Sequence, residues 1–485
     1  MGNAIDFKKE QKKQITNAIK VLSEDLRSNR FVKGEMQFTD ITNRDYFLKA
    51  LGNDLRYCKP WDRFLLWNGT NWEIDDDNQT EVNAVEFIHQ MYRGKRYIKD
   101  PQLSIDFERH LVKSESYRRI KAMIELCKMS RQTIVKADEF DRDPYLFNTK
   151  ENSILLKKSV EIREPSRDDL CTKRSNFVYD KDADCPVWKH FLMQVMGQDK
   201  ELIRYVQKAM GYALTGDVGE QCIFILWGSG ANGKSTFLNT LQYLFGDYGC
   251  STGVETFMKK TSDQSNDLAR LCGKRLVTTS ETEQGKALSE SLVKQITGED
   301  KLTARFLYGE YFSFAPTFKI FMATNHKPRI KGSDWGIWRR IKLIPFTVTI
   351  PKEQRDRKLG EKLLKENAGI LNWLLEGVLL WKKEGLNDPE CVRAATEEYR
   401  DDMDTVGTFL KECFDVDATG KMRVSNSELY KCYQQWCQEN SERLGSQRYL
   451  ALRLGEKGFR KMCGNGMRFW CGLSIKGDWK RRIMF

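Results

Sequence analysis

The chain has 485 residues, of which 80 are Lys or Arg and 68 are Asp or Glu, so its formal net charge is +12. Hydrophobic residues make up 40% of the chain, which is enough for packed cores, and the length predicts about three domains. The charge is compatible with a nucleic-acid partner, although it is spread along the chain. Thirteen cysteines without a C-x-x-C pair and four histidines indicate neither a disulfide framework nor a zinc site.

The cysteine usage predicts a reducing cytosol, with the cytoplasm of a bacterial host expected. The chain begins Met1-Gly2, but Asp6 replaces the Ser or Thr of a myristoylation signal. No apolar run is long enough for a membrane span. We therefore expect neither secretion nor membrane insertion.

The N-terminal part reads as helices around a short hairpin. Residues 7–28 have the spacing of an amphipathic helix, and residues 64–74 predict two strands joined by a polar turn. Residues 82–138 are largely helical in pattern, and their basic stretches are more typical of a solvated face than of a DNA contact. Residues 188–214 also predict helix.

A glycine-rich loop follows an apolar run at residues 222–227 that predicts a buried strand. The loop fits G-x-x-x-x-G-K-[ST] and predicts a phosphate-binding site, whose backbone N–H groups would face an anion. Its residues are Gly228, Ser229, Gly230, Ala231, Asn232, Gly233, Lys234 and Ser235, with Thr236 next. Lys234 is expected to reach the β- and γ-phosphates and Ser235 to hold Mg²⁺, so ATP and Mg²⁺ are the predicted cofactors.

Polar side chains also follow two later strand-like runs. Residues 275–280 lead into Glu281, which we favour as the carboxylate for Mg²⁺ and the attacking water, and Glu283 is a second candidate. Residues 317–324 end at Asn325, an amide able to sense the γ-phosphate. The alternatives are an exposed acidic turn and an Asn that merely begins a turn.

Paired arginines precede a fourth strand-like run at residues 342–346. Arg339 and Arg340 lie one loop beyond Asn325 and suggest an arginine finger that reaches the nucleotide of a neighbouring subunit. Solvated surface arginines are the alternative.

The C-terminal segment predicts a winged helix. A capping box at residues 425–428 opens one helix, a second helix is expected over residues 447–456, and residues 459–475 suggest a strand pair. Arg448 and Arg453 would then lie nearest to DNA in a major groove. The same fold also binds proteins.

The order of these motifs resembles superfamily 3 helicases and, more narrowly, the phage and plasmid primase-associated helicases related to the poxvirus primase-helicase. The resemblance covers most of the chain and rests on the glycine-rich loop followed by residues 280–283, 294–300, 304–305, 323–325, 338–341 and 345–346. Residues 38–40 and 67–72 resemble the start of the family's N-terminal helicase-associated domain, and residues 406–475 its C-terminal winged helix.

The resemblance implies a ring, with a homo-hexamer expected, that moves along single-stranded DNA in the 3′ to 5′ direction. Glu281 becomes the Walker B carboxylate, Asn325 the first sensor, and Arg340, ahead of Arg339, the finger supplied in trans. Residues 301–312 fall where such helicases place a hairpin in the central channel. Their pattern of two β-prone arms agrees, and the expected DNA contacts are Lys301, Arg305 and the stacking ring of Tyr308 or Phe306.

The expected fold is α/β, with a P-loop (AAA+-like) ATPase core, a mainly helical N-terminal region and a C-terminal winged helix. The division into domains is an N-terminal helicase-associated region at residues 1–140, a helical collar at 141–215, the ATPase core at 216–350, a helical lid or connector at 351–405 and a winged helix at 406–485.

These features predict an ATP-dependent DNA helicase for replication of a phage or other mobile genetic element. Its expected partners are single-stranded and forked DNA and a primase or polymerase. A nucleotide-switched origin-binding initiator or loader without unwinding is one alternative. A fused primase-helicase is another, although the acidic clusters at residues 75–77 and 180–184 lie in polar loops without flanking strands.

Overall fold

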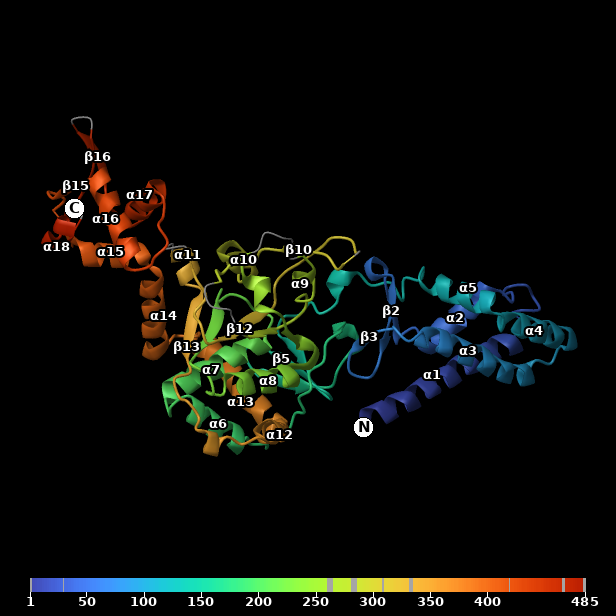
Figure 1. Cartoon of the computed structure of the whole chain (residues 1–485). Helices are drawn as coiled ribbons and strands as arrows, with labels where there is room; N and C mark the ends of the chain where they lie inside the picture. The colour runs from blue at the N-terminus through green and yellow to red at the C-terminus, as the bar shows by residue number, and fades with distance from the viewer. Residues whose placement is uncertain are drawn as a thin grey trace.

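The computed structural model describes residues 2–28, 30–259, 265–280, 286–307, 309–330, 335–417, 419–464 and 467–482. Figure 1 shows an elongated molecule, with an N-terminal helical region at one end, an α/β region in the middle and a small C-terminal domain at the other end. The expectation of a mixed α/β chain with N-terminal helices is confirmed.

The middle region is built on a five-stranded sheet in the order β13-β7-β12-β9-β8, and every neighbouring pair is parallel. Its strands are β7 (Ile223–Trp227), β8 (Gly249–Ser251), β9 (Leu276–Ser280), β12 (Lys319–Thr324) and β13 (Ile341–Pro345). Because the strands are parallel, their carboxyl ends share one edge and their amino ends share the other. The two edges carry different groups of polar residues.

Both faces of the sheet are buried, which explains why its strands read as continuous apolar runs. One face packs on α6 (Pro186–Val195), α7 (Lys200–Leu214), α8 (Lys234–Phe245), α12 (Leu359–Lys365) and α13 (Asn367–Glu384). The other packs on α9 (Ser265–Ala269), α10 (Glu290–Ile296), α11 (Trp335–Trp338) and Tyr399 of α14 (Glu390–Met403).

One expectation about the flanking helices needs correction. The helix predicted over residues 188–214 is broken between α6 and α7, because Gly197 and Gln198 both adopt φ of 62°. The helices expected to form a lid or connector after the sheet include α13, which lies in the main core against α7. A Cβ on Gly211 would lie 2.3 Å from the backbone of Gly377, so glycines permit this close helix contact.

Residues 141–215, expected to form a helical collar, also contain a three-stranded antiparallel sheet. Its strands are β4 (Leu146–Asn148), β5 (Ser153–Leu156) and β6 (Val160–Arg163). Phe147, Ile154 and Leu156 are fully buried in the same core as α7 and α8. Packing against this core therefore stabilises the short runs of residues 146–163 as β-strands.

The N-terminal region has its own core, separate from that of the sheet. It contains α1 (Gly2–Arg27), α2 (Asp40–Leu51), α3 (Gln79–Met91), α4 (Pro101–Ser114) and α5 (Tyr117–Cys127), with the antiparallel strands β1 (Leu55–Cys58), β2 (Arg63–Trp67) and β3 (Trp72–Ile74). The predicted first helix and the hairpin at residues 64–74 are confirmed.

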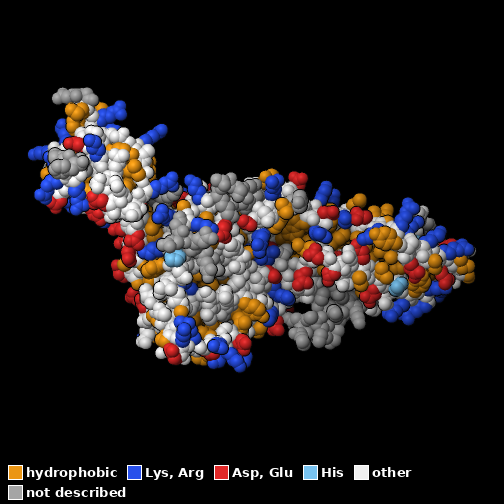
Figure 2. All heavy atoms as spheres, in the orientation of Figure 1, with side chains coloured by type: hydrophobic (Ala, Val, Ile, Leu, Met, Phe, Trp, Pro, Cys, Tyr) orange, Lys and Arg blue, Asp and Glu red, His pale blue; other side chains and the backbone are white. Residues whose placement is uncertain are grey.

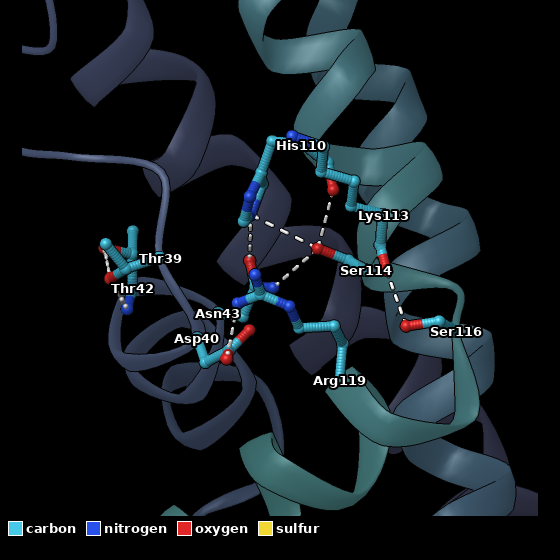
Figure 3. Close-up of polar contacts among 9 residues, drawn as sticks. All are labelled: Thr39, Asp40, Thr42, Asn43, His110, Lys113, Ser114, Ser116 and Arg119. Atoms are coloured by element: carbon cyan, nitrogen blue, oxygen red, sulfur yellow. Dashed lines mark hydrogen bonds and ion pairs between the residues drawn. The ribbon is translucent and has the colours of Figure 1, made fainter.

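A polar cluster joins α2 to α4 and α5 in this region (Figure 3). His110 Nε2 lies 2.8 Å from Asn43 Oδ1, and Asn43 Nδ2 donates to Ser114 Oγ at 2.9 Å. Arg119 forms an ion pair with Asp40 at 2.7 Å beside them. Burial lowers the pKa of His110 to about 4, so the ring is neutral near neutral pH.

A strap at residues 171–176 connects the N-terminal region to α8. Trp72 N donates to Cys171 O, and Asn71 Nδ2 donates to Thr172 O. At the other end of the strap, Asn176 N donates to Leu244 O and Asn176 Nδ2 to Tyr243 O. The hairpin of the N-terminal region is thus hydrogen-bonded, through one short segment, to the carboxyl end of the helix that follows the glycine-rich loop.

The C-terminal domain consists of α15 (Thr405–Cys413), α16 (Asn426–Glu439), α17 (Gln447–Glu456) and α18 (Gly477–Arg482) with the strands β14 (Phe414–Val416), β15 (Arg423–Ser425), β16 (Lys461–Gly464), β17 (Met467–Cys471) and β18 (Leu473–Ile475). Ser425 and Glu428 form the expected capping box. The helix predicted over residues 447–456 is confirmed. Strand β16 pairs antiparallel with β17, with Lys461 opposite Trp470 at one end and Gly464 opposite Met467 at the other.

Candidate functional site

The glycine-rich loop connects β7 to α8 at the carboxyl edge of the sheet. Gly228 follows the end of β7 in a position too crowded for a side chain, because a Cβ there would lie 2.2 Å from Phe346 O. Gly230, Ala231 and Gly233 have φ of 106°, 52° and 82°, values that favour glycine. The sequence thus allows a tight reversal that delivers the chain into the first turn of α8 at Lys234.

Lys234 is the centre of this loop. Only 4% of the residue is exposed, and its Nζ donates to Gly228 O at 2.8 Å, Asn232 Oδ1 at 2.9 Å and Asn325 Oδ1 at 3.1 Å. All three acceptors are uncharged, and burial lowers the pKa of Lys234. A buried cation with neutral acceptors is well suited to an anionic ligand, which would supply the missing negative charge.

The backbone around Lys234 offers donors for such an anion. Among the described residues, no acceptor takes the N–H groups of residues 230–236, which include the first turn of α8. Donors at a helix N-terminus, together with the helix dipole, favour phosphate. Ser235 is exposed beside them and Thr236 is half-buried. The loop therefore fits the phosphate groups of a nucleotide.

Asn325 lies at the same edge because β12 is the direct neighbour of β7. Thr324 pairs with Trp227, and Gly228 N donates to Thr324 O at 3.3 Å. The side chain of Asn325 is exposed and contacts Lys234. Two residues separated by about ninety positions are thereby joined, as their strand-end positions predicted.

Three predicted site residues lie outside the described part of the chain. Glu281 and Glu283 follow β9, which ends at this same edge, and Tyr308 follows β10 in the sequence. Their assigned roles stay predictions.

Arg339 and Arg340 precede β13 and lie at the opposite, amino edge of the sheet, where Ile223 N donates to Arg340 O. Arg340 is 8% exposed, and its guanidinium donates to Thr297 Oγ1, Gly336 O and Gln221 Oε1 at 3.1, 2.6 and 3.2 Å. Arg339 is exposed and donates to Gln221 Oε1 at 2.8 Å. Only Arg339 presents its side chain to the surface.

The hairpin expected at residues 301–312 is a two-stranded antiparallel sheet of β10 (Leu302–Ala304) and β11 (Phe312–Phe314). Lys301 and Arg305 are exposed, and the Arg305 guanidinium lies 4.8 Å from the centre of the Tyr311 ring. Phe306 is 51% exposed and stacks on Phe312. Cations and aromatic rings therefore meet at the surface of this hairpin.

The two arginines of α17 differ in availability. Arg448 is exposed, whereas the Arg453 side chain is 13% exposed, pairs with Glu456 at 2.7 Å and lies over the Tyr449 ring. The structure thus leaves Arg448 as the more accessible cation.

Sequence reasoning missed two buried cations at the amino edge. Arg275 donates to Leu214 O and to Leu146 O, the latter at 2.6 Å. Lys319 donates to the carbonyl groups of Thr215, Asp217 and Thr317. The available signal was a single charged residue at the start of each apolar strand run.

Comparisons with known proteins agree with the order of these regions. Residues 44–197 match the model described as D5 N terminal like, residues 226–340 a family of unknown function, and residues 401–468 the model described as poxvirus D5 protein-like. The predicted family resemblance is confirmed. The D5-like parts flank the region that holds the glycine-rich loop.

Proteins with similar sequences come from viruses. "Putative helicase L207/L206" of Acanthamoeba polyphaga mimivirus is 30% identical over 325 residues, covering 62% of this chain and 34% of that protein. "Putative helicase V13" of Sputnik virophage is 24% identical over 312 residues, covering 57% and 40%. The chain thus spans between a third and two fifths of the length of these relatives.

Among solved structures, the C-terminal region of NrS-1 aligns with a TM-score of 0.43 at 10% identity, over 86% of this chain and 95% of that one.

Of the helices that the structure describes, none has both the length and the apolar character that crossing a membrane requires. In the described ranges, His, Cys, Asp and Glu side chains form no group of three that could hold a metal ion.

Proposed function

We propose that this chain is an ATP-dependent DNA helicase that acts in replication of a virus or other mobile genetic element. One observation carries the proposal: a buried, charge-uncompensated Lys234 surrounded by backbone N–H donors without acceptors among the described residues. Such a site suits a phosphate-bearing ligand. The helicase names of viral relatives support the choice of reaction.

ATP would bind with its phosphates against residues 228–236 and its γ-phosphate near Lys234 and Asn325. Ser235 and Glu281 would hold Mg²⁺, which neutralises phosphate charge during phosphoryl transfer when bound. Lys234 would exchange its contacts with Gly228 O and Asn325 Oδ1 for phosphate oxygens. Asn325, which directly follows β12, would then lose its hydrogen bond with Lys234, so nucleotide binding would change the contacts at the end of that strand.

The finger that completes the site is proposed to come from a neighbouring subunit of a ring, with a hexamer as the expected state. Arg339 is the better candidate, because the Arg340 guanidinium is buried and bonded within its own chain. Both arginines lie at the sheet edge opposite Lys234, so neither lies beside the loop of its own subunit.

The exposed hairpin of β10 and β11 is proposed to grip single-stranded DNA, with movement in the 3′ to 5′ direction. Lys301 and Arg305 would contact phosphates, and exposed Phe306 could stack on a base. On α17, Arg448 is proposed to contact duplex or origin DNA. Arg453 is proposed only to stabilise the helix through its contacts with Glu456 and Tyr449.

The test measures ATP hydrolysis with and without single-stranded DNA, and separation of forked duplexes carrying a single 3′ or 5′ tail, in one preparation. DNA-stimulated hydrolysis with opening of the 3′-tailed fork supports the proposal. Hydrolysis without strand separation on either fork would instead favour a nucleotide-switched initiator or loader.

Lys301→Ala/Arg305→Ala distinguishes a motor from a switch. Loss of two phosphate contacts should abolish unwinding while hydrolysis without DNA stays within about twofold, because Lys234 is held by residues 228, 232 and 325 and not by the hairpin. A suitable control is Lys352→Ala/Lys358→Ala, which removes two exposed cations outside the hairpin. Normal unwinding by the hairpin variant would move the DNA grip elsewhere.

A further inference from the structure

We propose that a basic groove in the N-terminal region binds the phosphate backbone of single-stranded DNA. The groove lies between the segment after α1, the exposed side of α2 and the loop after α5, and its volume is about 570 Å³. That volume lies in the range of ligand-binding clefts. The inference rests on the proposed function, because it adds a second DNA contact to the same motor.

The charge of the groove favours an anion. Its lining includes Arg30, Arg44, Lys49 and Arg131 against one carboxylate, Asp45, among the residues that the structure describes. Arg44 is paired with Asp45 at 2.7 Å, so this carboxylate is already neutralised. The groove therefore keeps an excess of positive charge.

Two of these cations form no ion pair with a carboxylate in the described part of the chain. Arg30 forms ion pairs with Asp25 and Glu35 at 2.9 and 3.5 Å. Lys49 and Arg131, in contrast, are exposed, and no carboxylate among the described residues lies within ion-pair distance of either. Lys49 and Arg131 are thus the groups that a phosphate would gain most by contacting.

The walls of the groove are held in place before any ligand binds. Tyr46 is buried and donates to Asp25 at 2.6 Å, which fixes α2 against α1. Thr133 is fully buried, its hydroxyl donates to Cys127 O at 2.5 Å, and its own carbonyl accepts from Tyr57 N at 2.7 Å. Lys49 and Arg131 therefore project from a fixed framework, which lowers the entropy cost of binding.

The remaining lining indicates contact with the backbone of a strand rather than with its bases. Tyr46 is the only aromatic residue of the described lining, and it is 1% exposed, so no ring is available for base stacking. Met129 is 72% exposed and Met36 is half-buried, and such side chains adapt to varied surfaces. Contacts to phosphate alone position a strand without selecting its sequence.

The test uses Lys49→Ala/Arg131→Ala in the full chain, with a fluorescent oligonucleotide of single-stranded DNA as the probe. Binding should weaken about three- to tenfold, and the slope of log affinity against log salt should become shallower by about 1.4, or roughly 0.7 for each lost phosphate contact. The change should be the same with and without nucleotide, because the groove does not include residues of the glycine-rich loop.

The matched control is Lys113→Ala/Arg118→Ala, which removes two exposed cations at the end of α4 and the start of α5. It should leave affinity and salt slope unchanged, and both variants should keep the hydrolysis rate measured without DNA. If the wild type binds DNA and the groove variant matches it, the groove proposal fails while the helicase proposal stands. If the wild type binds no single-stranded DNA, both proposals fail.

Discussion

The two edges of the central sheet both bury cations, but they give them different partners. At the carboxyl edge, Lys234 contacts one loop carbonyl and two Asn side chains, beside a row of N–H groups that have no acceptor among the residues described. At the amino edge, Arg275 and Lys319 contact main-chain carbonyls of the segments that surround α7 and β4. None of these cations has a carboxylate ion pair among the described residues.

The difference in hydrogen-bond acceptors indicates that Lys234 belongs to a binding site, whereas Arg275 and Lys319 have a structural role. Carbonyls around Arg275 and Lys319 belong to segments far apart in the chain, so the cations hold those segments to the sheet. The acceptors of Lys234 come from the loop itself and from Asn325, and a ligand phosphate can replace them. Burial lowers the pKa of both Lys234 and Lys319, so a nearby anion would stabilise the charged form of either side chain.

The largest expected effect compares the two arginines of the amino edge. Arg339→Ala should reduce hydrolysis about a thousandfold or more while nucleotide binding is retained, because an arginine finger stabilises charge only in the transition state. Mixing it with Lys234→Ala should restore part of the activity through mixed interfaces. Arg340→Ala should instead destabilise the fold by about 2–3 kcal/mol, because buried acceptors lose their donor. Equal loss of stability in both variants would contradict this division of roles.

At the carboxyl edge, Lys234→Ala should lower ATP hydrolysis by about a hundredfold or more, as loss of one charge-stabilising donor does. The free energy of unfolding should change by less than about 1 kcal/mol, because Lys234 links only the loop and Asn325, and removal of its buried charge recovers the free energy that its burial costs. Hydrolysis assays and urea unfolding of the same preparation measure both quantities. Near-normal turnover by the folded variant would remove the phosphate-binding role.

The opposite pattern is expected for Arg275→Met. The free energy of unfolding should fall by about 2–4 kcal/mol, since two buried carbonyls and one partly buried carbonyl lose a charged donor. Hydrolysis per folded molecule should stay within about twofold. Arg270→Met is the matched control, because Arg270 is exposed and its loss should cost less than about 0.5 kcal/mol. If the Arg275→Met protein were as stable as the wild type, Arg275 would not be holding the segments around α7 and β4 to the sheet.

His110 gives the smallest effect and a comparison from the separate N-terminal core. Its folded pKa of about 4 lies below the usual 6.5, so the unfolded chain binds more protons between these values. Stability from the neutral ring is complete above pH 6.5 and is lost as the pH falls toward 4. Between pH 7.5 and 5 the loss should be about 1–2 kcal/mol, discounted because the ring is partly exposed.

His110→Asn should remove this slope, which urea unfolding of the N-terminal region at several pH values would measure. Arg275 cannot shed its proton in this range, so the amino edge should contribute no comparable slope. A wild-type curve without extra loss between pH 6.5 and 4 would mean that His110 is not held neutral.

Local patterns were sufficient for several elements. The glycine spacing of residues 228–235, the capping box at Ser425 and the polar turn of the 64–74 hairpin each depend on a few consecutive residues, and the structure has the corresponding loop, helix and strands. The meeting of Asn325 with Lys234 was also predictable, because parallel strands end at one edge. Each of these inferences needs only chain-local chemistry and the rule for parallel sheets.

The tertiary structure decided which side chains are buried and what they contact. The strands of residues 146–163 exist because they pack on the core of α7 and α8, and Gly197 ends a helix whose periodicity continues past it. Neighbouring Arg339 and Arg340 look equivalent in the sequence, yet one is exposed and the other is bonded to Thr297, Gly336 and Gln221. The sequence by itself determined which chemical groups are available at each strand end. Their burial depends on segments distant in the chain, so only packing of the whole molecule could divide them into site and scaffold.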